Sequence, residues 1–185
     1  MRKRKPVLMI HEVESWMLER DLSKYILTFD DGLLSQYENF EKLQTFNTPM
    51  YFFISTGIIG PPKEEQSSDV IKCAKAHEIF FNSGDTSYYM NWEQIKYIAN
   101  QSNCFIGGHS HAHKDLRGLS KIKELHDHLV KDTDKMIAEF SYQNLTIDSF
   151  CFPYNYEPPL YMEILKKEGI VNFFGTERLA IEDLR

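Results

Sequence analysis

The sequence predicts a single-domain α/β fold built on parallel strands, and three observations support this prediction. Short apolar segments alternate with segments of helical periodicity along the whole of residues 1–185. One of the apolar segments is long and continuous, which is typical of a strand buried on both faces of a parallel sheet. Polar residues directly follow the predicted strands, at the end where barrels of parallel strands assemble their chemistry.

Four elements are expected in the first third of the chain. Val7 to Ile10, four apolar residues in a row, is expected to be a buried strand. Tyr25 to Phe29 is rich in β-branched and aromatic residues and predicts a second strand. Leu33 to Phe46 has helical spacing of apolar residues and ends before Pro49. Met50 to Gly57 is apolar throughout and predicts a central strand.

The middle of the chain is less regular. Residues 60–90 read as a loop, with a helix expected across Val70 to Ile79. Asn91 is expected to cap a helix from Trp92 to Ala99. Phe105 to Gly108 predicts a short strand that runs into His109.

The last third predicts two more strands and two helices. A long amphipathic helix is expected from Ser120 onward, followed by a strand at Ile147 to Phe152. Pro159 to Glu168 predicts a helix that Gly169 ends, and Ile170 to Phe174 predicts the last strand. The buried stripe of the long helix is expected to hold six apolar residues: Ile122, Leu125, Leu129, Met136, Ile137 and Phe140.

The composition excludes several classes of protein. A length of 185 residues with 42% hydrophobic content suits one compact domain. The net charge is −6 and the longest basic block, Arg2-Lys3-Arg4-Lys5, reads as a solvated terminus, so no nucleic-acid partner is expected. Three widely spaced cysteines suit a reducing compartment. No apolar run is long enough for a signal peptide or a membrane span, so we expect a cytoplasmic protein, with a removed natural leader as the alternative.

Asp30 and Asp31 form the first chemical signal, because they lie side by side at a predicted strand end. Adjacent carboxylates repel each other unless a cation lies close by, and a divalent metal is the economical explanation. One aspartate would then bind the metal and the other would serve as a base. A solvated Asp-Asp-Gly turn is the alternative.

His109 and His113 form the second signal. They share a face whether the segment is helical or extended, so two imidazoles converge in a way that suits zinc. His111 shares that face only on a strand and is interpreted as a bystander. A surface histidine cluster is the alternative, which the preceding apolar strand disfavours. Two histidines and one carboxylate leave positions open for water and substrate, the pattern of a catalytic site that performs hydrolysis.

These residues resemble the polysaccharide deacetylases, also called the NodB-homology family or carbohydrate esterase family 4, over roughly residues 7 to 175. Thr28-Phe29-Asp30-Asp31-Gly32 is similar to the first motif, in which the first Asp is the catalytic base and the second a metal ligand. His109-Ser110-His111-Ala112-His113 is similar to the second motif, His-Ser/Thr-x-x-His, whose outer histidines complete the metal set. Phe150-Cys151-Phe152-Pro153-Tyr154 resembles the third, Arg-x-Pro-Tyr.

The resemblance implies a distorted (β/α) barrel of the polysaccharide-deacetylase (NodB) type. In it, Asp31, His109 and His113 would bind one divalent metal ion. Zinc is favoured, and cobalt, nickel or another divalent ion are the alternatives. Asp30 would take a proton from the water that attacks the acetamide carbonyl. The backbone N–H of Tyr154 would help the metal to stabilise the oxyanion.

The chain departs from the family pattern in its third, fourth and fifth motifs. Cys151 stands where the third motif has the arginine that orients the base. Arg178 is a candidate replacement from the next strand, and a surface position for Arg178 is the alternative. The Asp-rich fourth motif has no counterpart. The fifth, Leu-x-His, which supplies the general acid, is also absent, since no histidine follows His128.

His11 is the predicted general acid in place of the missing one. Met9-Ile10-His11-Glu12-Val13 resembles the N-terminal Tyr-His-Asp-Val segment of deacetylases with circularly permuted motifs. The first and last strands of a closed barrel are neighbours, so a histidine from either could reach the same metal. A strand-end histidine that only makes hydrogen bonds is one alternative, and an acid located beyond Arg185 is another.

The expected function is a metal-dependent hydrolase that removes N-acetyl groups from an amino sugar in a glycan or glycan precursor. The expected cytoplasmic location favours a lipopolysaccharide or O-antigen type of precursor. One alternative is a catalytically impaired barrel that binds carbohydrate or serves as an assembly module, which Cys151 and the missing motifs favour. Another is an amidase acting on a small non-sugar amide. The sequence predicts no oligomeric state.

Overall fold

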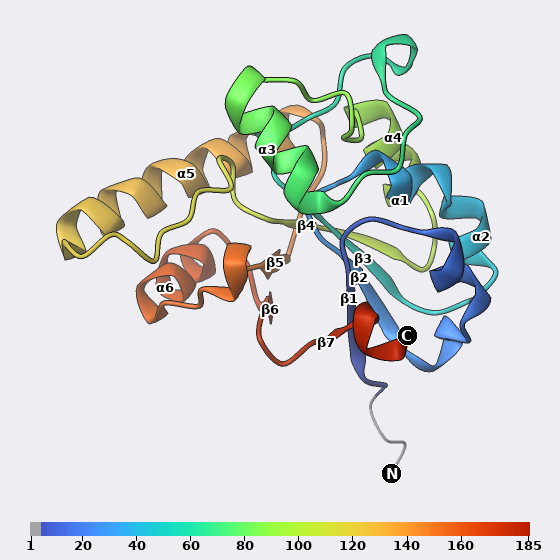
Figure 1. Ribbon diagram of the computed structural model, residues 1–185. Helices are drawn as coiled ribbons and strands as arrows, with labels where there is room; N and C mark the ends of the chain where they lie inside the picture. Colours follow the sequence, from blue (N-terminus) through green and yellow to red (C-terminus); the bar gives the residue numbers. More distant parts are fainter. Residues whose placement is uncertain (1–4) are drawn as a thin grey trace.

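The computed structural model describes residues 5–185, in which seven parallel strands form one sheet in the order β6-β5-β4-β3-β2-β1-β7 (Figure 1). The prediction of a solvated terminus at Arg2 to Arg4 lies outside the described residues. The strands are β1 (Val7–Ile10), β2 (Ile26–Phe29), β3 (Met50–Ile54), β4 (Cys104–Gly108), β5 (Ser149–Cys151), β6 (Asn172–Phe174) and β7 (Leu179–Ala180).

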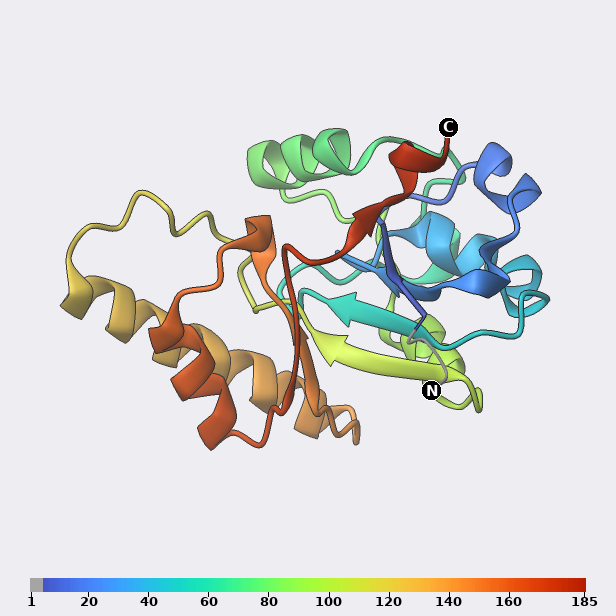
Figure 2. The ribbon, with the colours of Figure 1, turned by 90° about the horizontal axis from the view of Figure 1, so that it is seen from below.

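Helical segments connect consecutive strands in the described part of the chain, except that a short loop joins β6 to β7. Figure 2 shows α5 and α6 packed together at one end of the molecule, away from the other α-helices. The α-helices are α1 (Leu34–Glu38), α2 (Phe40–Gln44), α3 (Cys73–Ser83), α4 (Trp92–Ala99), α5 (Ile122–Tyr142) and α6 (Pro159–Lys167). The short 3₁₀ segments are η1 (Ser15–Glu19), η2 (Leu22–Lys24), η3 (Lys63–Glu65), η4 (Pro153–Asn155) and η5 (Ile181–Leu184).

The register of the sheet brings the polar strand ends to one edge. Ile10 of β1 pairs with Phe29 of β2, so the next residues, His11 and Asp30, leave the sheet at the same level. The strands β3 and β4 pair in parallel up to their last residues, and His109 directly follows β4. Because all strands run in the same direction, their carboxyl ends form one rim.

The sheet curls into an incomplete barrel of the expected distorted type. Sequence analysis missed β7, because two residues are too short to show a periodicity. This strand, rather than β6, lies beside β1. The expectation that the first and last strands are neighbours therefore holds for Leu179–Ala180 and is wrong for the strand predicted at Ile170 to Phe174. The described edge strands β6 and β7 are not paired with each other, so the barrel stays open on that side.

Two details of the predicted helices are wrong and one is confirmed. The helix expected from Leu33 to Phe46 is two helices, because Asn39 has non-helical dihedral angles (φ −100°, ψ 6°). Ile122, expected to be buried, is 78% exposed, because it lies in the first turn of α5, at the outer end of the helix. Asn91 caps α4 as predicted, and it shares a reciprocal capping box with Gln94.

Aromatic side chains fill the space between the sheet and its helices. Phe29 of β2 and Phe52 of β3 stack with their ring centroids 4.6 Å apart, and both are fully buried. Burying a phenylalanine stabilises a fold by roughly 1.5–3 kcal/mol, so such pairs hold the strand ends in place. Within residues 5–185, none of the helices has both the length and the apolar character needed to cross a membrane.

Candidate active site

An open cavity of about 700 Å³ lies at the carboxyl ends of the strands. Its volume falls in the range of sites that bind small molecules, roughly 300–1,000 Å³. The loops after β1, β2, β4 and β5 contribute to its walls, so the sheet brings together residues that are far apart in the sequence. All six residues predicted for the site line it: His11, Asp30, Asp31, His109, His113 and Tyr154.

Asp31 lies at the centre of a group of imidazoles. Its Oδ1 atom is 2.9 Å from Nε2 of His113, 3.2 Å from Nε2 of His109 and 3.6 Å from Nε2 of His77. This buried Oδ1 atom has no hydrogen-bond partner of acceptable geometry. Ligand atoms held 2.0–2.1 Å from a tetrahedral zinc ion lie about 3.3 Å from one another, so these separations fit a divalent cation. The residues present therefore suit the metal that the motifs imply.

A backbone carbonyl orients one of the two predicted histidine ligands, and a side-chain hydroxyl binds the backbone of the other. The Nδ1 atom of His109 lies 2.8 Å from the carbonyl oxygen of Cys151, which directs Nε2 toward Asp31. The N–H of His113 donates to the hydroxyl of Ser110 at 2.9 Å, which closes the turn between the two histidines. Both histidine side chains are about 95% buried or more. The His109 imidazole is thus held in one direction, whereas Nδ1 of His113 has no hydrogen-bond partner.

The backbone is strained around the cavity. Seven non-glycine residues in the described chain have positive φ, and five of them belong to the loops of the site: Asp31, Ser110, His113, Tyr154 and Asn155. Such conformations cost of order 1–3 kcal/mol each and concentrate at functional sites. The value of +72° at Asp31 turns the chain sharply after β2. That turn lets two consecutive aspartates face the same cavity, although neighbours on a strand would point to opposite sides.

Asp30 forms a buried ion pair with Arg178. Nη1 of Arg178 donates to Oδ1 of Asp30 at 2.8 Å, and each side chain is only 3% exposed. The thiol of Cys151 donates to the other carboxylate oxygen at 3.4 Å. Burial alone would raise the pKa of Asp30, but the charges of Arg178 and His109 and the hydrogen bond from Arg178 together outweigh it, and the pKa lies below its usual value. The alternative of a surface position for Arg178 is therefore wrong.

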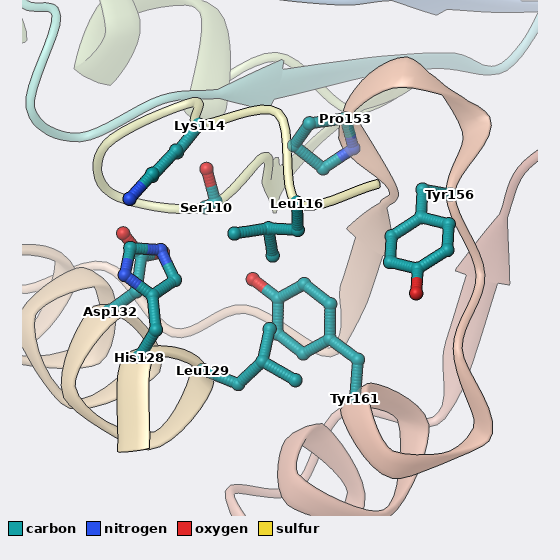
Figure 3. Close-up of a pocket in the computed structure, with 9 residues that line it drawn as sticks. All are labelled: Ser110, Lys114, Leu116, His128, Leu129, Asp132, Pro153, Tyr156 and Tyr161. Atoms are coloured by element: carbon teal, nitrogen blue, oxygen red, sulfur yellow. The ribbon is translucent and has the colours of Figure 1, made fainter. Parts of the chain in front are cut away.

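Asp132 of α5 supports the histidine loop, a role that sequence analysis missed. Its carboxylate accepts from the N–H of His111 at 2.7 Å and from that of Ala112 at 2.9 Å. Figure 3 shows Asp132 beside a second cavity, between the histidine loop, α5 and α6. That cavity has only about 10 Å³ of free space, room for one water molecule, so it cannot admit a sugar.

His11 and Glu12 serve different purposes after β1. Nε2 of His11 lies 4.0 Å from Oδ2 of Asp31, and its side chain is 35% exposed at the cavity. Glu12 is nearly buried and accepts hydrogen bonds from Nζ of Lys72 at 2.8 Å and from the N–H of Cys73 at 3.0 Å. Glu12 therefore fastens the start of α3 next to the site.

Helix α3 contributes Cys73 and His77, which sequence analysis did not place in the site. The helix itself was predicted, but the pattern of residues 70–79 did not indicate which face of the helix meets the cavity. The signal that was available is the i, i+4 spacing of a thiol and an imidazole, which puts both on one helix face. Sγ of Cys73 lies 3.0 Å from Oδ2 of Asp31. Burial lowers the pKa of His77 to about 4, so this imidazole is neutral near pH 7.

Comparison with known proteins gives concordant results. A family model described as polysaccharide deacetylase matches residues 19–173. IcaB from Ammonifex degensii superposes with a TM-score of 0.68 at 20% identity, over 95% of this chain and 84% of that one. A de-N-acetylase from Aggregatibacter actinomycetemcomitans gives 0.66 at 12% identity, over 95% and 92%. The deacetylase PplD of Streptococcus pyogenes gives 0.60 at 15% identity, over 88% and 79%. A search of curated protein sequences found no significant match.

Proposed function

The chain belongs to the polysaccharide deacetylase family, and we propose from this that it removes N-acetyl groups from an amino sugar within a glycan. The reaction adds water to the acetyl carbonyl carbon, breaks the C–N bond and releases acetate and the free amine. One observation carries the proposal: the base candidate Asp30, held by Arg178, lies in the same cavity as the cluster of Asp31 and its histidines.

The metal would be held by Asp31, His109 and His113, because Nε2 of each histidine lies within 3.2 Å of Oδ1 of Asp31. A divalent ion bound there, zinc in the first instance, polarises a carbonyl and lowers the pKa of a water molecule. His109 presents Nε2 because its Nδ1 is engaged by the carbonyl of Cys151. The Asp31 carboxylate is almost fully buried, so it cannot be satisfied by bulk water.

The chain's own groups would carry the proton transfers. Asp30 accepts the proton of the attacking water, because Arg178 keeps its carboxyl ionised. His11 donates a proton to the departing amine, because its ring is partly exposed at the cavity and can exchange protons with solvent. The N–H of Tyr154, on a strained turn at the rim, donates to the carbonyl oxygen as its charge develops.

The alternative of a carbohydrate-binding module rested on Cys151 in the arginine position of the third motif and on the missing fourth and fifth motifs. Arg178 weakens the first of these arguments, because it supplies a guanidinium to the same aspartate. A binding module has no need of a buried ionised base beside a cation site. The narrower assignment, a lipopolysaccharide or O-antigen precursor handled in the cytoplasm, stays a prediction from family analogy.

A metal and acetate assay tests the proposal. The purified protein is stripped with a chelator, reloaded with zinc, and incubated with N-acetylhexosamine oligomers and lipid-linked precursors while released acetate is measured. We expect zinc-dependent release that Asp30→Asn abolishes and that the exposed control Asp127→Asn leaves unchanged. Zinc binding without acetate release from any of these glycans would favour the binding module. A protein that takes up no metal would overturn the proposal.

A further inference from the structure

Helix α3 forms one wall of the cavity and directs two side chains toward Asp31. Cys73 and His77 are one helical turn apart, and both line the same cavity as Asp31. None of the three motifs that resemble the deacetylase family includes a residue of this helix.

His77 points at the same oxygen atom as the two predicted histidine ligands. Its Nε2 lies 3.6 Å from Oδ1 of Asp31, and its ring lies 4.3 Å from that of His113. This Nε2 atom is buried and has no hydrogen-bond partner. A buried polar atom left unsatisfied costs about 1–3 kcal/mol, a penalty that a shared cation would remove.

The position of His77 is fixed by contacts at the start of its helix. Glu12, only 7% exposed, binds both Nζ of Lys72 and the N–H of Cys73. Ala76, the residue before His77, is fully buried in a small cluster with Tyr89. Helix α3 is thus anchored at its start and at the residue beside the imidazole, so the approach of His77 to Asp31 is built into the fold.

We propose that His77 is a further ligand of the divalent ion, so that three imidazoles and one carboxylate hold it. This inference rests on the proposed function, because it presumes the ion held by Asp31, His109 and His113. Three nitrogens and one oxygen fill the four positions of a tetrahedral ion, whereas a catalytic ion needs one position open. Substrate must therefore bind as an additional ligand or displace His77. The contacts of α3 with the site would then depend on whether metal and substrate are bound.

The test compares metal binding in His77→Ala, His77→Phe and the wild type. The phenylalanine variant keeps an aromatic ring packed against His113 and removes the ring nitrogens, which separates ligation from packing. His126→Ala, at an exposed histidine of α5, is the control. Zinc affinity is measured by competition with a chromophoric chelator, and the cobalt(II) absorption spectrum reports the ligand set.

Loss of an outer partner of a metal site lowers affinity about 10–100-fold, so loss of a direct ligand should lower it at least tenfold. We expect this in both His77 variants, with an altered cobalt spectrum that added imidazole restores in His77→Ala. Unchanged affinity and spectrum in a folded His77→Phe protein would overturn the inference and leave the proposed function intact. A wild-type protein that binds neither metal would instead overturn the proposed function.

Discussion

Arg178 and Asp30 are 148 positions apart in the chain, yet they form an ion pair of 2.8 Å from which solvent is almost excluded. Arg178 precedes β7 and Asp30 follows β2, so the pair spans the strand β1 between them. The same Nη1 atom also donates to the hydroxyl of Thr28 at 3.1 Å. The guanidinium of Arg178 thus reaches Asp30 from the residue before β7, whereas the arginine position of the family's third motif, Cys151, lies in β5.

Arg178→Met should both destabilise the protein and impair the base. Removing one partner of a buried ion pair costs about 3–5 kcal/mol in the free energy of unfolding. The pKa of Asp30 would rise without the neighbouring guanidinium, so its carboxyl would be a poorer base and kcat/KM should fall by at least about 100-fold. Denaturant unfolding and acetate release measure the two effects. The control is Arg185→Met, whose pair with Glu14 is exposed and contributes at most about 1 kcal/mol. Equal losses in the two variants would contradict the prediction.

Placing an arginine at Cys151, the position of the third-motif arginine, should restore part of the activity that loss of Arg178 removes. Sγ of Cys151 lies 3.4 Å from Oδ2 of Asp30, so an arginine there could reach the same carboxylate. We expect Cys151→Arg in an Arg178→Ala background to exceed Arg178→Ala alone in kcat/KM, because the buried charge is again paired. Circular dichroism verifies folding. A folded double variant with no recovery would show that Arg178 acts by more than its charge.

His11→Gln should slow amide hydrolysis selectively. Loss of a general acid lowers the rate about 10²–10⁴-fold when the leaving group needs a proton. Hydrolysis of 4-nitrophenyl acetate, whose leaving group departs without protonation, should stay near the wild-type rate. His111→Gln is the matched control, because Nδ1 of His111 contacts the hydroxyl of Thr56 at 3.0 Å, outside the cavity. A similar loss on both substrates would remove His11 from the role of acid.

Asp132→Asn should weaken both the fold and the metal site. An amide has one acceptor oxygen, so one of the two N–H groups of His111 and Ala112 loses its partner, at about 1–3 kcal/mol. Zinc affinity should fall about 10–100-fold, as for other supporting residues of metal sites. Asp134→Asn, at an exposed position of α5, is the control. Zinc affinity equal to that of the wild type would limit Asp132 to a role in folding.

Zinc should stabilise the folded protein through Asp31. A ligand that binds only the folded state adds about 2.7 kcal/mol when its concentration is 100 times Kd. The melting temperature should therefore rise on zinc titration and fall again with a chelator. Magnesium should have a smaller effect, because it prefers oxygen ligands to imidazoles. In Asp31→Asn the zinc shift should shrink. A shift of wild-type size in that variant would place the ion elsewhere.

Much of the fold could be predicted because its signals are local. Runs of apolar residues mark β1 to β5, and the capping residue Asn91 marks the start of α4. The helix break at Asn39 and the exposed Ile122 were missed, since both depend on where a helix meets its neighbours. β7 was missed because two residues carry no periodic signal, although this short strand delivers Arg178 to the site.

The sequence by itself determined the alternation of strands and helices, the two adjacent aspartates and the histidine pair, because each of these features depends only on residues that are close together in the chain. Only the tertiary structure decided which distant side chains join them. Arg178, His77 and Asp132 reach the site from the residue before β7, from α3 and from α5, and no spacing rule connects them to Asp30 or Asp31. Such contacts form because the curled sheet and its helices place loops that are distant in the sequence next to one another. That arrangement is a property of the whole packed domain.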